Sequence, residues 1–138
     1  MALSGATASS YKPSSATLGK TITVVVTGSK AGYVSTGSTS APTAGVAAGA
    51  LTSAMPKITG TAKVGSTLTA SAGSWGAATV TLTYQWKANG VAIAGATATT
   101  YKPTSATVGK VITVTVTGKK TGYVTANRTS AATSVVVK

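Results

Sequence analysis

The stretch ATATTYKPTSATVGKVITVTVTGKKTGYV at Ala96–Val124 decides the fold, because it occurs twice in the chain. The earlier copy, ATASSYKPSSATLGKTITVVVTGSKAGYV at Ala6–Val34, aligns with it without a gap at an offset of 90 residues. Extending the alignment to Met1–Val46 against Val91–Val136 gives 28 identities in 46 positions. A duplication at a fixed period indicates one structural unit used more than once. The first copy begins in the middle of that unit, so the sequence predicts one complete and one partial unit.

Alternating side chains within this stretch predict a β-strand in each copy, at residues 21–26 and 110–118. Among the outward-facing residues of the two strands, Val25 stands in the position of Thr115. This difference suggests that the outer face of the first copy is partly covered. The inward-facing residues are Ile22, Val24 and Val26 in the first copy and Ile112, Val114 and Val116 in the second.

The composition favours an all-β protein. Thr and Val prefer strands and Gly and Ser prefer turns, and these residue types make up much of the chain. The chain is 43% hydrophobic but has no Phe, two Trp and five Tyr, so the core has to be mainly aliphatic. We expect the core to be formed by Tyr84, Trp86, Ile112, Val114 and Val116.

Turn signals divide the chain into residues 1–43, a partial unit, residues 44–55, a linker of small residues, and residues 56–138, the complete unit. The complete unit shows about seven short strands with turns every 8–12 residues, and Asn89-Gly90 is a hairpin signal. This pattern predicts a β-sandwich with Greek-key connections, preceded by part of a second sandwich.

Three segments resemble the immunoglobulin-like repeat that occurs in tandem in bacterial, especially actinobacterial, surface proteins and that is also appended to phage structural proteins. They are PKITGTAKVGSTLTASAGSW from Pro56, YQWKANGVAIAGATATTYKPTSATVGKVITVTVTG from Tyr84 and GYVTANRTSAAT from Gly122. The resemblance covers residues 56–138, and residues 1–46 resemble the C-terminal half. It implies an immunoglobulin-like Greek-key β-sandwich and a non-catalytic spacer, display or adhesion role.

The chain departs from this family in its acids, which are replaced by Thr, Ser, Ala or Lys. The family usually has Asp just before the Val-Gly-Lys turn, whereas this chain has Thr107 there and Thr17 in the first copy. Contacts of relatives that depend on acids or cations are therefore not expected here. Trp86 stands where the family has its core Trp, which implies a packing role.

The charge is unusual, with 12 Lys and Arg, no Asp or Glu, and a net charge of +12. Without carboxylates, imidazoles or thiols, the usual acid–base, triad and metal-ligand chemistries have no residues to carry them. We therefore predict no catalytic residue, no cofactor, no metal and no small-molecule substrate. The net charge serves either solubility or attraction to an anionic surface. The candidate anion contacts are Lys30, Lys119, Lys120 and Arg128.

The partial first copy would expose one apolar sheet face and an unpaired edge. We expect this face to pack against another copy of the chain or against a structural protein that supplies the missing sandwich layer. The candidate assembly face consists of Tyr11, Ile22, Val24, Val25, Val26 and Tyr33.

No apolar run approaches a membrane span, and the first residues show no signal peptide. We therefore expect a structural or display module on a virion or at the extracellular cell surface. Two alternatives stay open: a soluble cationic binder of nucleic acid or cell-wall polymer, and an engineered acid-free scaffold without a native function.

Overall fold

The computed structural model describes residues 1–138, and the chain divides into two compact units, Met1–Gly49 and Ala50–Lys138. The regular structure consists of nine strands and two single 3-10 turns, η1 at Ser15–Thr17 and η2 at Ser105–Thr107. All pairings within the sheets are antiparallel. The all-β prediction is therefore confirmed, and its physical basis is the abundance of Thr and Val, which fit a pleated, half-buried surface.

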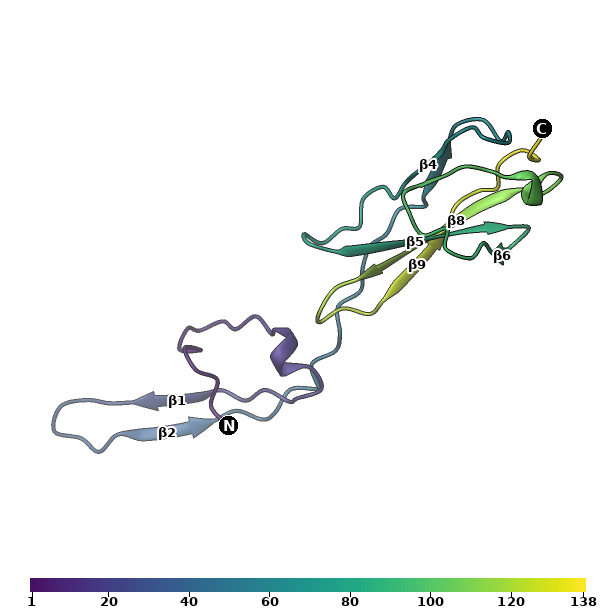
Figure 1. The fold of residues 1–138 in the computed structure, drawn as a ribbon. Coiled ribbons are helices and arrows are strands. Elements are labelled where there is room, and N and C mark those ends of the chain that lie inside the picture. Colours follow the sequence, from purple (N-terminus) through teal and green to yellow (C-terminus); the bar gives the residue numbers. More distant parts are fainter. The chain divides into compact units, whose positions relative to one another are not determined.

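The second unit contains two sheets (Figure 1). The three-stranded sheet has the order β3-β4-β7, and the four-stranded sheet has the order β6-β5-β8-β9. This arrangement is consistent with a β-sandwich. The strands are β3 (Lys57–Thr59), β4 (Leu68–Ser71), β5 (Thr81–Ala88), β6 (Val91–Ala92), β7 (Thr100–Tyr101), β8 (Ile112–Lys119) and β9 (Ala126–Thr129).

The core of the second unit lies where the inward side chains of both sheets meet. Leu68 of β4, Trp86 of β5 and Val114 of β8 are fully buried in one cluster. Trp86 donates its indole N–H to the carbonyl oxygen of Ala98 at 2.8 Å, and its ring lies 5.7 Å from that of Tyr101. The tryptophan thus buries its large apolar surface while its one polar group keeps a partner. Ile112 and Val116 are also fully buried, and the half-buried Tyr84 packs against the same core.

Trp75 forms a second core cluster with Leu51, Ala72 and Val116. The sequence pattern places Trp75 in a loop, but the structure leaves its side chain only 4% exposed. It lies on Gly118 of β8, where an added Cβ would be 2.4 Å from the ring atoms. A glycine inside a strand often marks such a close approach. Leu51, which belongs to the predicted linker, is buried in this cluster as well.

The β5–β6 hairpin turns at Asn89-Gly90, as the sequence signal predicts. Both residues have positive φ, 47° at Asn89 and 80° at Gly90. A two-residue hairpin loop of this kind favours Asn-Gly because asparagine and glycine tolerate the left-handed conformation. Asn89 also accepts a hydrogen bond from the Val111 N–H through its side-chain oxygen at 3.0 Å, so the turn is tied to the chain entering β8.

The first unit contains one hairpin, β1 (Val25–Gly28) with β2 (Thr36–Thr39), and the single turn η1 (Figure 1). In η1 the Thr17 hydroxyl accepts a hydrogen bond from the Ser14 N–H at 3.2 Å and donates to the Ser14 carbonyl oxygen at 2.8 Å. Thr17 is 1% exposed. Thr107 makes the same two contacts with Thr104 in η2. A hydroxyl can both donate and accept, whereas an ionised carboxylate can only accept.

The strand of the first copy differs from its prediction. The pattern predicts a strand over residues 21–26, whereas β1 runs from Val25 to Gly28. The reason is visible in the second unit, where β9 pairs only with residues 115–118 of β8 and β5 pairs with all of residues 112–119. The first unit has no strand in the position of β5. Residues 22–24 therefore lack the partner that defines the strand at residues 112–114.

Candidate functional site

The β1–β2 hairpin repeats the β8–β9 hairpin in the same register. Val25 pairs with Thr39, and the corresponding pair at the offset of 90 residues is Thr115 with Thr129. The three following pairs correspond in the same way. The duplication seen in the sequence is therefore a duplication of strand pairing as well.

The side-chain contacts that continue each hairpin are also repeated. Ile22 N–H donates to Thr43 Oγ1 at 3.0 Å, and Ile112 N–H donates to Thr133 Oγ1 at 3.1 Å. The next such contact, from Val24 to Ser40 at 3.1 Å, corresponds to that from Val114 to Ser130 at 3.1 Å. The first unit thus has the local geometry of a completed sandwich half.

The two hairpins differ in how deeply their inward-facing side chains are buried. The inward-facing residues of β8 are fully buried, whereas Val24 is 55% exposed and Val26 is 64% exposed. Ile22 is half-buried. Apolar surface in water is unfavourable by about 25 cal/mol per Å². The first unit therefore presents an apolar sheet face, defined by Ile22, Val24 and Val26, which we call the open face.

The edge of β1 opposite β2 is also unpaired. In the second unit the equivalent edge of β8 pairs with β5 over eight residues. Backbone N–H groups alternate between the two edges of a strand. Because Val24 N–H donates toward Ser40, the N–H groups of Thr23, Val25 and Thr27 lie on the unpaired edge. Such an edge is a template for another strand.

The other predicted members of the assembly face occupy three separate positions. Tyr11, which is 40% exposed, corresponds to Tyr101, whose ring packs on Trp86 in the second unit. Tyr33, which is 72% exposed, follows β1 in the hairpin loop, where Lys30 Nζ lies 5.2 Å from the centre of its ring. Val25 is 62% exposed and alternates with Val24 and Val26, so its side chain faces the opposite side of the strand.

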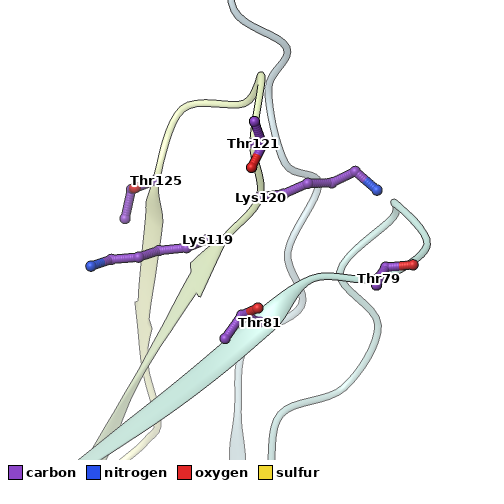
Figure 2. A pocket seen from close by; sticks show the side chains of 6 residues that line it. All are labelled: Thr79, Thr81, Lys119, Lys120, Thr121 and Thr125. Carbon is purple, nitrogen blue, oxygen red and sulfur yellow. The ribbon is translucent and has the colours of Figure 1, made fainter. Parts of the chain in front are cut away.

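Two of the predicted anion contacts line a shallow basic pocket of about 550 Å³ in the second unit (Figure 2). Lys119 and Lys120 point away from each other in this view. Lys120 donates to the carbonyl oxygen of Ala78, and its Nζ lies 5.6 Å from the centre of the Tyr123 ring. The pocket lining consists of Thr79, Thr81, Lys119, Lys120, Thr121 and Thr125.

The other two predicted anion contacts, Arg128 and Lys30, do not line this pocket. Arg128 Nε is 3.5 Å from the Ser53 carbonyl oxygen, and Arg128 Nη1 donates to the Asn127 carbonyl oxygen at 3.2 Å. Lys30 belongs to the first unit, where it repeats the Lys120–Tyr123 contact. Lys119 and Lys120 therefore line one pocket with their side chains pointing away from each other, and the structure does not gather the four residues into one anion site.

Thr79 is strained at the mouth of the basic pocket, because its φ of 62° is rare for a β-branched residue. The sequence gives no sign of this backbone strain, because a threonine just before a strand is not unusual. Strained backbone is often found at binding sites. Here the strained residue directly follows Ala78, whose carbonyl oxygen accepts a hydrogen bond from Lys120.

Comparison with protein-family profiles, curated proteins and solved structures finds no match to this chain. Neither helical segment has the length and apolar character that a membrane-spanning helix requires.

Proposed function

We propose that this chain is a non-catalytic, immunoglobulin-like structural module, displayed on a bacterial or phage surface, that docks through its first unit. The observation that carries the proposal is the open face. The hairpin β1–β2 has the register and hydrogen bonds of β8–β9, but Val24 and Val26, the counterparts of two residues that β8 buries completely, are left exposed. A preformed apolar face beside an unpaired edge is the arrangement that strand-addition interfaces use.

The strand order of the second unit supports the immunoglobulin-like part of the proposal. The chain passes from the three-stranded sheet to the other between β4 and β5, returns for β7, and crosses again to β8. Crossings of this kind between two antiparallel sheets are typical of Greek-key sandwiches. The buried Trp86 on β5 is the counterpart of the core tryptophan expected from the family resemblance.

Residue chemistry supports a structural role. The chain has no Asp, Glu, His or Cys, so the common general acids, bases and thiol nucleophiles are missing by residue type. The second unit buries Trp75 and Trp86 in its core, and one of its surface pockets is a shallow one of lysines and threonines. The net charge of +12 would draw such a module toward an anionic surface.

Native mass measurement at about 50 mM and about 500 mM salt tests this proposal, because apolar association persists at high salt while contacts with a polyanion weaken. We expect any association of the chain to persist at the higher salt, to be lost in the V24S/V26S double variant and to be retained in V25T. V25T is the matched control, because Thr115 occupies that position in the other copy. A first unit whose amides exchange like those of an unfolded chain would contradict the proposal.

A second candidate function is binding of an anionic polymer, which the basic pocket favours. Lys119 and Lys120 lie on the same pocket as four threonine hydroxyls, and the chain carries no carboxylate side chain to compete for them. Titration with polyphosphate tests this function. Binding that falls steeply with salt and is weakened in K119A/K120A would favour it over docking.

A further inference from the structure

We propose that the Asn89-Gly90 turn is a site of spontaneous covalent modification, at which the Asn89 side chain loses ammonia and the chain gains a carboxylate. The site belongs to the second unit alone, and it does not depend on the proposed function. Its basis is an exposed asparagine side chain placed next to an unhindered glycine nitrogen. The change matters for this chain because it has no side-chain carboxylate before the reaction.

The nitrogen of Gly90 is free to act as the nucleophile. It lies in the two-residue loop between β5 and β6, where Gly90 is exposed and its N–H makes no backbone hydrogen bond. A Cβ added to Gly90 would have no atom within 4 Å, so this side of the turn is open to water. Glycine also has no side chain that would hinder an attack by its nitrogen.

The side-chain carbon Cγ of Asn89 is the electrophile, and the fold polarises it. Asn89 is exposed, and its Oδ1 accepts a hydrogen bond from the Val111 N–H at 3.0 Å. Attack on Cγ places negative charge on Oδ1, and a backbone N–H that already points at this oxygen stabilises that charge. The net charge of +12 also favours a step in which negative charge develops.

The reaction needs only water and hydroxide. The Gly90 nitrogen gives its proton to hydroxide and forms a bond to Asn89 Cγ, while the Cγ–Nδ2 bond breaks and Nδ2 takes a proton from water and leaves as ammonia. The product is a succinimide ring that joins the two residues. Water then opens the ring at Cγ, which gives aspartate at position 89, or at the main-chain carbonyl carbon, which gives isoaspartate. No atom is oxidised or reduced.

The fold accepts the first of these products and rejects the second. Aspartate keeps the backbone of the turn and an oxygen that accepts from the Val111 N–H, in a bond that the negative charge strengthens. Isoaspartate adds a methylene group to the backbone of a loop whose length sets the register of the hairpin. That loop lies between the Ala88–Val91 pair, and the Asn89 N–H donates to the Val111 carbonyl oxygen at 3.0 Å. The isoaspartate form therefore cannot keep all of these contacts.

Asn127, the other asparagine of the chain, is the internal control. It lies within β9, where it pairs with Thr117 and its Oδ1 accepts a hydrogen bond from the Thr117 hydroxyl at 2.7 Å. The next residue is Arg128, whose side chain hinders its nitrogen and whose backbone is held by pairing with Val116. Asn127 should therefore stay unmodified under conditions in which Asn89 reacts.

The experiment incubates the full chain in mildly acidic and in mildly alkaline buffer and follows its charge by cation-exchange chromatography. We expect a species whose net charge is lower by one, +11 instead of +12, to form faster in the alkaline buffer, because the reacting nitrogen has to lose its proton. Peptide mapping by mass spectrometry should place the change at Asn89 and leave Asn127 intact. N89D is the control, since it carries the product charge from the start and should not lose charge further.

Amide exchange separates the two products. We expect the N89D variant to keep the slow exchange of Val111 and Ile93, whose N–H groups donate to Asn89 Oδ1 and to the Trp86 carbonyl oxygen. The purified isoaspartate form should exchange faster at both positions. The proposal is overturned if the chain keeps its charge in both buffers, if the change maps to Asn127, or if N89D loses charge at the same rate. Unchanged exchange in the isoaspartate form would show that the hairpin tolerates both products.

Discussion

Corresponding residues of the two copies, which are nearly the same in sequence, can have different surroundings. Gly118 lies under the Trp75 ring, whereas Gly28, its counterpart, has open space above it. Thr17 and Thr107 make the same pair of contacts, so the environment of the 3-10 turn is unaffected by the missing half. The contacts that differ are those which the segment before residue 91 supplies in the second unit.

Substitution of the two glycines gives a matched pair of variants. We expect G118A to destabilise the second unit by about 1–3 kcal/mol, because the new methyl group overlaps the Trp75 ring. We expect G28A to leave the stability of the first unit unchanged or slightly raised, because alanine loses less backbone entropy than glycine. Chemical unfolding followed separately for each unit measures both. Equal effects at the two positions would contradict the assigned packing.

Thr107 is expected to stabilise the second unit through its hydroxyl. T107V keeps the shape of the side chain but removes the hydrogen bonds to Thr104, which lie at 3.1 and 2.9 Å, so a loss of about 1–2 kcal/mol is expected. T113V is the control, because Thr113 faces outward on β8, and its effect should stay within about 0.5 kcal/mol. Urea unfolding of the three proteins gives the comparison.

The strands illustrate how pairing sets the length of an element. β8 runs over residues 112–119 because β5 lies along its whole length, whereas β1 covers only the residues that β2 can pair. Nearly the same residues, ITVTVTGK at 112–119 and ITVVVTGS at 22–29, therefore form a long strand in one unit and a short one in the other. Hydrogen bonding to a neighbour, and not local preference, decides where these strands begin.

Amide exchange in the chain alone should show this asymmetry. We expect Thr23, Val25 and Thr27 to exchange at least about tenfold faster than Thr113, Thr115 and Thr117, because only the second set has a strand beside its edge. Val26 should be slower than Val25, since its N–H lies toward β2. Uniform protection of β1 would show that its outer edge is already covered in solution.

At the scale of the whole molecule, the absence of Asp, Glu and His has a thermodynamic consequence. Stability depends on pH only where the folded and unfolded states bind different numbers of protons. The side chains that ordinarily change charge around pH 4.5 to 7 are those of Asp, Glu and His, and this chain has none of them. The acid unfolding that is common in carboxylate-containing proteins has no basis here.

We therefore expect the free energy of unfolding to change by less than about 0.5 kcal/mol between pH 4.5 and 7. Urea unfolding at constant ionic strength is the appropriate measurement, because urea is uncharged and leaves the screening of the +12 chain unaltered. A change larger than about 1 kcal/mol would mean that a group with a strongly altered proton affinity contributes to the fold.

The sequence by itself determined the all-β class, the repeat at an offset of 90 residues, the Asn89-Gly90 turn and the absence of Asp, Glu, His and Cys. These follow from local features: residue type, alternation and turn propensity. The tertiary structure alone decided that Trp75 is buried, that Thr79 and Thr81 line a pocket with Lys119 and Lys120, and that β1 begins only at Val25. Each of these depends on a partner distant in sequence, or on its absence, and no local pattern encodes that.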